Sequence, residues 1–441
     1  MQGQSSPMDL EPIEGVSGQL LEWHPDHVPL TTGQAGRQLP FQRWFPFKEA
    51  FAPQFVADVL ARDGRGTGTL LDPFGGSGTS ALTAQHLGWN AHTIEVNPFL
   101  ADLIQAKLHA YDVAQLRRNW STILARVGRA RPSLSRLYAQ APRTLVEPGE
   151  ADRWVFSAAV LRRVAAYRQT IEALPDAAMR RFFRVQLGAI LVPLSHVVIS
   201  GKGRRYRRGW QQLNWTGADV DARLARAVDS AIADVAAARP HAGSRCTVAR
   251  GDARALLADA PVADCALFSP PYPNSFDYTD IYNLELWVLG YLNSKDDNRR
   301  LRHATVQSHV QLIRTASPPP DSPQLTRCLQ RLARVRDQLW SPHIPAMVGS
   351  YFHDLAHVLH HVAWKVTPGG RVVVVVGDSR YEDVYVDVAA ILQELAPACG
   401  LRVTQCEAMR SMRVSPQQGG QPGLTETAIT FTVQRRSTAA P

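Results

Sequence analysis

The sequence has little cysteine, little lysine and no long apolar run, and each shortage narrows the class of protein. Its five cysteines are scattered over 441 residues, and no two have the C-x2-C spacing of a zinc site or a redox motif. The longest apolar run, residues 187–199, contains Pro193 and is shorter than the ~20 residues that span a bilayer. We therefore expect a globular protein of two or three domains with free thiols.

Positive charge is concentrated in one part of the chain. The net charge is +9, and residues 111–240 hold 22 of the 48 Lys and Arg but only 10 of the 39 Asp and Glu. Only five of the 48 are lysine, which reflects either the bidentate phosphate recognition of arginine or the codon bias of a GC-rich genome. Codon bias does not explain the concentration in one segment, so we predict a polyanionic partner for this region.

Short apolar runs alternate with helical patterns in two parts of the chain. Residues 68–74 and 90–95 each have the pattern of a strand, and a helical pattern follows each of them. The alternation stops between residues 112 and 243, where the patterns are helical and show no strand. It resumes after residue 245 with five more apolar runs, near residues 246, 263, 371, 401 and 427. This predicts a seven-stranded, mostly parallel α/β sheet with a helical insertion.

A glycine-rich turn follows the first of these strands and opens a helix. It runs from Asp72 to Ser80 as DPFGGSGTS and lacks the Lys that follows the last glycine of a phosphate-binding loop. Its glycines let a ligand approach the backbone, and the Asp72 carboxylate suits an ammonium group. The second strand ends at Glu95, where a carboxylate can bind ribose hydroxyls. Together they predict a site for a nucleoside that carries an amino acid.

A second loop begins Ser269-Pro270-Pro271-Tyr272, directly after the apolar strand at residues 263–268. Ligands of a parallel sheet lie beyond the carboxyl ends of its strands, so this loop can face the glycine-rich turn. The exocyclic amine of a base is a weak nucleophile because its lone pair is delocalised into the ring. Acceptors at Ser269 and the Pro270 carbonyl can localise that lone pair, and the prolines stiffen the loop. Tyr272 offers a face on which an extruded base stacks, at about 1 to 3 kcal/mol.

The two motifs resemble motifs I and IV of the amino-methylating DNA methyltransferases, which methylate cytosine N4 or adenine N6. The family's first motif is DPF-x-GSG-TT, from which this sequence departs only at Ser80. Residues 44–55 resemble the family's motif X segment, and Asp252 matches the acidic residue near the adenine amino group of the cofactor. The resemblance covers residues 43–110 and 245–435 and leaves the insertion out.

The resemblance implies a class I, Rossmann-like fold with S-adenosyl-L-methionine as cofactor. It assigns cofactor binding to Lys48, Phe51, Asp72, Pro73, Phe74, Gly75, Gly76, Ser77, Gly78, Thr79, Glu95, Val96, Asn97 and Asp252. It assigns the chemistry to Ser269, Pro270, Pro271 and Tyr272. Ser at the first of these positions is similar to the cytosine-N4 enzymes, whereas Asp or Asn is typical of the adenine-N6 enzymes. Methylation at the C5 carbon needs a Pro-Cys dipeptide, which is missing, so direct transfer is expected.

A basic and aromatic segment lies near the end of the insertion. We expect contacts with DNA from Lys202, Arg204, Arg205, Tyr206, Arg207, Arg208 and Trp210, and with the extruded base from Asn274, Asp277 and Tyr278. A solvated basic loop is the alternative for the first group. Four histidines between His353 and His361 lack the Glu of an HExxH zinc motif, and we expect no metal.

These expectations divide the chain and define its function. Residues 1–40 are an extension, 41–110 and 244–435 the catalytic domain, 111–243 the DNA-binding insertion, and 274–349 an additional recognition region. The predicted activity is cytosine-N4 methylation of double-stranded DNA with base flipping. Adenine-N6 methylation, RNA amino-methylation and a catalytically silent DNA-binding subunit are the alternatives. The first 15 residues lack an export signal, so we expect a bacterial, cytoplasmic, nucleoid-associated protein with a cognate restriction endonuclease as a candidate partner.

Overall fold

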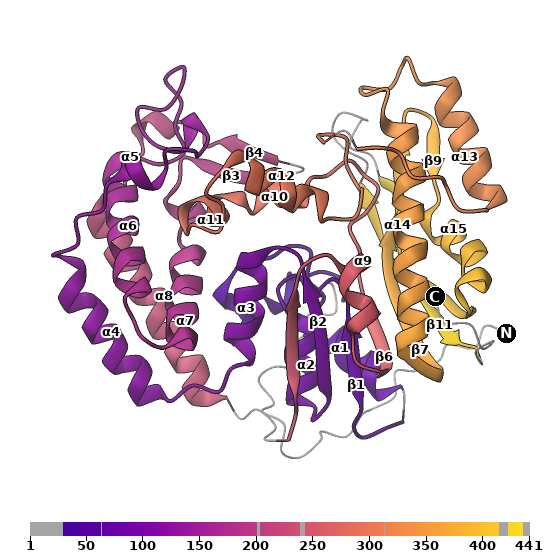
Figure 1. The fold of residues 1–441 in the computed structure, drawn as a ribbon, viewed down its shortest axis with the longest axis horizontal. Helices are drawn as coiled ribbons and strands as arrows, with labels where there is room; N and C mark the ends of the chain where they lie inside the picture. Colours follow the sequence, from indigo (N-terminus) through magenta and orange to yellow (C-terminus); the bar gives the residue numbers. More distant parts are fainter. Residues whose placement is uncertain are drawn as a thin grey trace.

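A seven-stranded sheet forms the centre of the protein (Figure 1). The computed structural model describes residues 30–62, 64–200, 203–238, 243–312, 314–413 and 422–434. The strands lie in the order β10-β11-β7-β6-β1-β2-β5, and β11 is antiparallel to both of its neighbours, whereas the other pairs are parallel. Their bounds are β1 (Thr69–Asp72), β2 (Asn90–Glu95), β5 (Cys246–Arg250), β6 (Ala263–Phe268), β7 (Val366–Gly377), β10 (Leu401–Arg413) and β11 (Pro422–Val433). The predicted mostly parallel, seven-stranded sheet is confirmed.

The central strands are buried on both faces, which explains their continuous apolar sequences. β7 carries five consecutive valines, Val372 to Val376, and all are buried. The TPGG sequence before them lies within the bounds of β7, where the pairing with β6 shifts from Ala263 opposite Val366 to Cys265 opposite Arg371. Gly369 has φ +81° there, so these residues form an irregularity inside the strand.

Helices cover both faces of the sheet. Leu70 and Leu267 contribute to an apolar core with α1 and α2, while Leu71 and Phe268 point to the opposite face and pack with α14 and α15. The bounds on the first face are α1 (Pro53–Ala61), α2 (Thr79–His86) and α3 (Pro98–Leu108). Those on the second are α9 (Ala253–Leu256), α14 (Ile344–Lys365) and α15 (Val388–Leu395).

The insertion forms a helical layer that packs against α3 through α7 (Figure 1). Its helices are α4 (Val113–Val127), α5 (Leu134–Leu137), α6 (Ala158–Glu172), α7 (Ala177–Ala189) and α8 (Gly217–Ala237). The expectation that it contains no strand is wrong. β3 (Val197–Ser200) and β4 (Gly203–Tyr206) pair as an antiparallel hairpin. The strands are short, and β4 carries two consecutive arginines, so no apolar alternation marked them.

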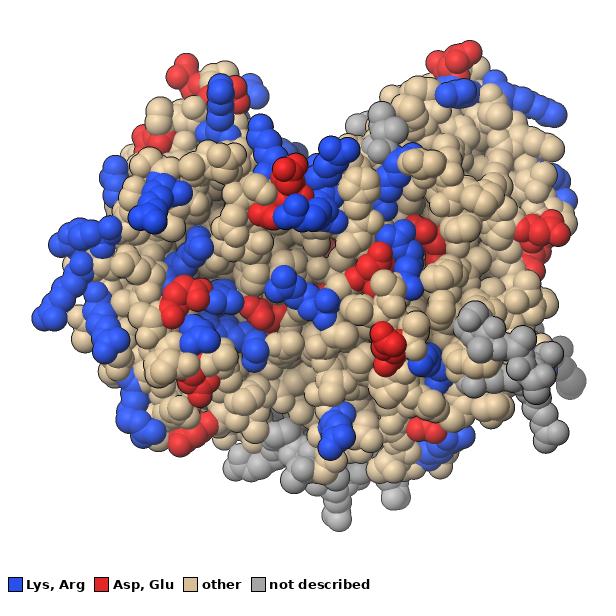
Figure 2. Space-filling view, viewed as in Figure 1, with Lys and Arg blue, Asp and Glu red and all other residues tan. Residues whose placement is uncertain are grey.

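Residues 274–349 divide between two lobes. α10 (Tyr278–Ile281), α11 (Asn283–Val288) and α12 (Lys295–His303) lie beside the insertion, whereas α13 (Pro323–Arg334) packs on α14 and α15 (Figure 1). A further hairpin, β8 (Ser379–Tyr381) and β9 (Val384–Val386), lies beside α13. Figure 2 shows a hollow between the two lobes, with Lys and Arg side chains around it.

Short 3-10 helices join several of these elements. They are η2 (Ala35–Gln38), η3 (Gln42–Trp44), η4 (Arg143–Leu145), η5 (Val192–Leu194), η6 (Trp210–Gln212), η7 (Leu257–Asp259) and η8 (Pro397–Cys399). Across the described part of the chain, no helix is both long and apolar enough to span a bilayer.

Candidate active site

A cavity of about 650 Å³ opens at the carboxyl ends of β1 and β6. These neighbouring strands stand where the strand order reverses, which is where ligands bind in open parallel sheets. Gly76 of the glycine-rich turn and Ser269 of the second loop both line the cavity. The two loops are almost 200 residues apart in the sequence, and the sheet brings them to one space of small-molecule size.

The glycine-rich turn is shaped by close contacts that leave no room for side chains. A Cβ atom at Gly75 would collide with the side chain of Thr93 and lie 2.8 Å from Cδ1 of Ile104. Gly76 and Gly78 have φ +52° and +81°, the left-handed region that glycine favours. Gly78 then caps α2. The turn therefore brings bare backbone at Gly76 to the cavity.

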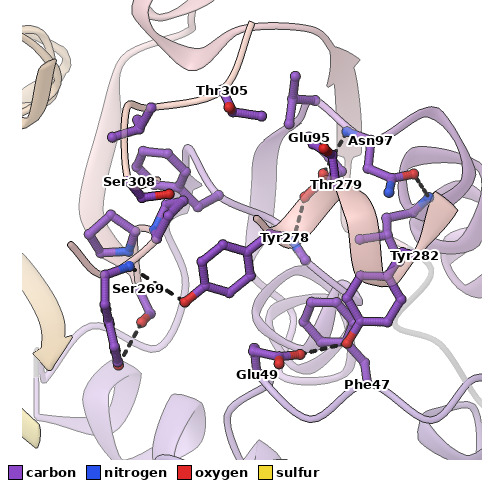
Figure 3. A pocket seen from close by; sticks show the side chains of 18 of the residues that line it. Phe47, Glu49, Glu95, Asn97, Ser269, Tyr278, Thr279, Tyr282, Thr305 and Ser308 are labelled. Carbon is purple, nitrogen blue, oxygen red and sulfur yellow. Dashed lines mark hydrogen bonds between the residues drawn. The ribbon is translucent and has the colours of Figure 1, made fainter. Parts of the chain in front are cut away.

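Glu95 ends β2 and anchors both the turn and the next helix (Figure 3). Its two carboxylate oxygens accept the backbone N–H groups of Gly76 and Asn97, each at 2.7 Å. A carboxylate can accept about four hydrogen bonds, so further donors in the cavity can bind to it. Burial raises the pKa of Glu95 to about 7, and the nearby Asp72 contributes to the rise.

Asp72 lies behind the turn rather than in the cavity wall. Its carboxylate is buried and accepts the backbone N–H of Phe74 at 3.0 Å, and burial raises its pKa to about 7. Lys107, which the sequence did not single out, also holds the turn by donating to the Ser77 carbonyl at 2.7 Å. Burial lowers the pKa of Lys107 to about 7.

The predicted cofactor residues fall into two groups. Those that line the cavity are Lys48, Pro73, Phe74, Gly76, Glu95, Val96, Asn97 and Asp252. Those that do not are Phe51, Asp72, Gly75, Ser77, Gly78 and Thr79. Asp252 caps α9 by accepting the backbone N–H of Arg254 at 2.9 Å, and it is also paired with that guanidinium.

All four residues of the Ser269–Tyr272 loop line the cavity. The Ser269 hydroxyl donates to the Tyr272 hydroxyl at 3.2 Å, and the Tyr272 hydroxyl donates to Glu426 at 3.0 Å. One edge of the Tyr272 ring rests on Gly377 at the end of β7, where an added Cβ would come within 2.5 Å of the ring. The ring is half-buried rather than sealed in the core.

Glu426 and Arg410 also line the cavity, and no sequence motif marks either residue. Glu426 lies on β11 and Arg410 on β10, the antiparallel pair at the edge of the sheet. The guanidinium of Arg410 donates to the two carboxylate oxygens of Glu426 at 2.6 and 2.7 Å. They lie close to the Ser269–Tyr272 loop because β11 pairs with β10 and with β7, which is distant in the sequence from that loop.

Aromatic side chains form another wall of the cavity (Figure 3). The rings of Phe47 and Tyr282 stack with their centroids 5.0 Å apart, and the Tyr282 hydroxyl donates to Glu49 at 2.6 Å. Glu49 lines the cavity, and desolvation by the surrounding side chains raises the pKa of its carboxyl group. The Tyr278 hydroxyl accepts the backbone N–H of Tyr272 at 3.5 Å.

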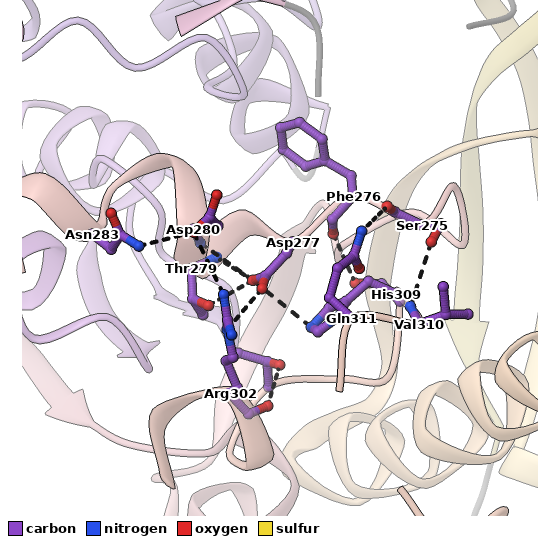
Figure 4. Close-up of polar contacts among 12 residues, drawn as sticks. Ser275, Phe276, Asp277, Thr279, Asp280, Asn283, Arg302, His309, Val310 and Gln311 are labelled. Atoms are coloured by element: carbon purple, nitrogen blue, oxygen red, sulfur yellow. Dashed lines mark hydrogen bonds and ion pairs between the residues drawn. The ribbon is translucent and has the colours of Figure 1, made fainter. Parts of the chain in front are cut away.

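Asp277 lines the cavity but is held by several partners (Figure 4). It caps α10 by accepting the backbone N–H of Thr279 at 3.0 Å, and Arg302 pairs with it at 2.8 Å. His309 lies 3.8 Å from the same carboxylate, and burial lowers the pKa of this histidine. Asn274 accepts the backbone N–H of Phe276 at 3.1 Å and does not line the cavity.

The basic segment is partly tied into the fold. Arg204 donates to Asn283 at 2.6 Å, and Arg207 donates to two backbone carbonyls, each at 3.0 Å. Tyr206 and Trp210 pack on each other with centroids 4.9 Å apart, and Trp210 is buried. The side chains of Arg205 and Arg208 are exposed. Lys202 lies outside the described residues.

The strand order, with β11 reversed beside β7, and a cavity at the ends of β1 and β6 define a class I methyltransferase fold. No protein-family model matches the chain. The chain is similar to the Type II methyltransferase M.AvaI of Nostoc sp., with 24% identity over 84% of this chain and 81% of M.AvaI. It is 33% identical to the Type II methyltransferase M.BsoBI of Geobacillus stearothermophilus over 21% of this chain and 19% of M.BsoBI. Among solved structures, TrmN of Thermus thermophilus aligns with a TM-score of 0.29 and 13% identity, over 87% of this chain and 49% of TrmN.

Proposed function

We propose that this protein transfers a methyl group from S-adenosyl-L-methionine to the N4 amine of a cytosine extruded from double-stranded DNA. The observation that carries the proposal is the single cavity shared by the glycine-rich turn and the Ser269–Tyr272 loop. The similarity to M.AvaI over most of both chains supports the DNA methyltransferase class. Ser at the head of the second loop favours cytosine N4 over adenine N6.

The residues around the turn fit the nucleoside part of this cofactor. Glu95 has acceptor capacity beyond its two backbone bonds, which suits the two hydroxyls of a ribose. Gly76 presents backbone without a side chain, so a ligand can approach closely. Asp252 lines the same cavity and suits the adenine amino group. When bound, the cofactor supplies a methyl group activated by a sulfonium.

The residues of the second loop fit the acceptor amine. The Ser269 oxygen and the Pro270 carbonyl accept hydrogen bonds from the two N–H groups of the amine. These bonds localise the nitrogen lone pair. With the cofactor bound, the nitrogen would take up the methyl group as the sulfur–carbon bond breaks, and it would release one proton to water. The half-buried ring of Tyr272 offers a stacking face to the base.

Duplex DNA is the substrate that the charge distribution favours. Arg205 lies on β4 and Arg208 follows that strand, and both side chains are exposed. Lys and Arg side chains also gather around the hollow between the lobes in Figure 2. Such side chains neutralise backbone phosphates and give binding that weakens with salt. This function implies association with the nucleoid, and a restriction endonuclease with the same recognition sequence is the candidate partner.

A methylation assay tests the proposal. The purified protein is incubated with isotope-labelled cofactor and either duplex DNA or RNA, and the digested nucleosides are identified by mass spectrometry. We expect N4-methylcytosine in duplex DNA, and Ser269→Ala should lose the product while retaining cofactor binding. N6-methyladenine would contradict the choice of base, and product in RNA alone would contradict the choice of polymer. Cofactor binding without turnover on any nucleic acid would contradict the enzymatic proposal.

A further inference from the structure

We infer that Glu426 is a positioning residue that orients a chain of hydroxyl hydrogens and thereby makes Ser269 an acceptor for the target amine. The chain runs from Glu426 through the Tyr272 hydroxyl to the Ser269 hydroxyl. This inference deepens the proposed function and depends on it. Its elements lie on β11 and on the loop after β6, which are separated in the sheet by β7.

The Glu426 carboxylate is saturated with donors. Arg410 donates to both of its oxygens, Tyr272 donates to one of them, and the Thr31 hydroxyl donates to the other. An ionised carboxylate is only an acceptor, and about four hydrogen bonds fill its lone pairs. Glu426 is also buried, so water does not compete with these donors. The Glu426 carboxylate therefore acts only as a hydrogen-bond acceptor.

A tyrosine hydroxyl has a single hydrogen, and Tyr272 uses it in the hydrogen bond that it donates to Glu426. The Tyr272 oxygen can then only accept from Ser269, whose hydroxyl lies 3.2 Å away. The Ser269 hydrogen is consequently directed toward Tyr272, and its oxygen lone pairs are left for the cavity. An amine hydrogen of the base meets an acceptor there. A freely rotating serine would present its own hydrogen to the amine in part of the population.

The surroundings fix the ring that relays this polarity. Gly377 supports one edge of the Tyr272 ring, and the Tyr278 hydroxyl accepts the Tyr272 backbone N–H at 3.5 Å. Because the ring is held by packing and by its backbone, removal of the hydroxyl alone should leave its position unchanged. The relay can therefore be tested separately from the stacking face.

The first test is Tyr272→Phe in a single-turnover methylation assay at saturating cofactor and DNA. The variant keeps the ring and lacks the hydroxyl, so we expect a rate constant about tenfold lower, the value of one net hydrogen bond. The dissociation constants for cofactor and DNA should stay within twofold of the wild type. Tyr385→Phe is the matched control, because its hydroxyl bonds to Asp378 outside the cavity, and its rate should be unchanged.

The second test is a double-mutant cycle with Glu426→Gln. Alone, this variant should slow transfer at least fivefold, because the amide has one acceptor oxygen for the donors that two carboxylate oxygens share, and its NH2 group competes for the place facing Tyr272. In the Tyr272→Phe background the same change should add less than twofold, because the relay is already broken. Glu407→Gln on β10 is the control for the change in charge, since Glu407 is exposed.

The outcomes separate the inference from its foundation. Full effects of Glu426→Gln in both backgrounds would show that Glu426 only supports the fold, and an unchanged rate in Tyr272→Phe would show that the hydroxyl relays nothing. Either result overturns the inference while wild-type methylation stands. If the wild-type protein methylates no nucleic acid, the proposed function itself fails.

Discussion

The raised pKa of Glu95 predicts that cofactor binding depends on pH. Its pKa in the free protein is about 7, raised from 4.5 chiefly by burial. In the proposed complex the ribose hydroxyls donate to the ionised form of Glu95, so binding favours deprotonation. The perturbation is a change of pH from 6 to 8, in which the ionised fraction rises from about 9% to about 91%. The dissociation constant should therefore fall about tenfold over this range and then level off.

Calorimetric titration with S-adenosylhomocysteine and with adenosine measures this effect. Adenosine carries the same ribose and no group that titrates between pH 6 and 8, so it isolates the contribution of the protein. At pH 7 about half a proton should be released per ligand, detected as a difference between buffers of unequal ionisation enthalpy.

Two variants complete the test. Glu95→Gln should bind more weakly and lose the pH dependence. Asp72→Asn should move the midpoint to lower pH, since the charge of Asp72 raises the pKa of Glu95. Affinity that is flat from pH 6 to 8 in the wild type, or an equal slope in Glu95→Gln, would refute the reasoning.

Three substitutions test other parts of the site. Gly75→Ala places a methyl group against side chains of β2 and α3, so the free energy of unfolding in a urea titration should fall by about 1 to 3 kcal/mol; unchanged stability would contradict the packing. Gly377→Ala places a methyl group 2.5 Å from the Tyr272 ring, so transfer should slow at least tenfold while cofactor affinity holds, and a normal rate would show that the ring position is unimportant. Alanine at both Arg205 and Arg208 should weaken DNA binding in fluorescence anisotropy and reduce the slope of log K against log salt by about 2, whereas an unaltered slope would place the DNA elsewhere.

Local sequence patterns were sufficient to predict the sheet and one side of the cavity. The strand before Asp72 and the strand ending at Glu95 are marked by apolar runs, and the turn between them by its glycines. Asp72, which was expected to contact an ammonium group, does not line the cavity, and its carboxylate accepts the N–H of Phe74 behind the turn. The spacing of residues along the sequence does not reveal the direction in which a side chain at the end of a strand points.

The missed residues depend on contacts between distant segments. Glu426 reaches the cavity through the antiparallel pairing of β10 and β11, and nothing in the TETAITF sequence distinguishes it from an exposed strand residue. Lys107 lies between Ala106 and Leu108 near the end of α3, which is a weak signal that a buried amine has a partner. The β3–β4 hairpin escaped because arginines occupy one of its strands.

The path of the chain after Tyr272 has a mechanical consequence. The segment leaves the Ser269–Tyr272 loop, builds α10 to α12 on one lobe and then crosses to form α13 on the other. A rigid polymer seated in the hollow would press on both lobes at once, and any change in their separation would pull on the Ser269–Tyr272 loop. Engagement of the duplex and readiness of the loop for chemistry would then be a single event.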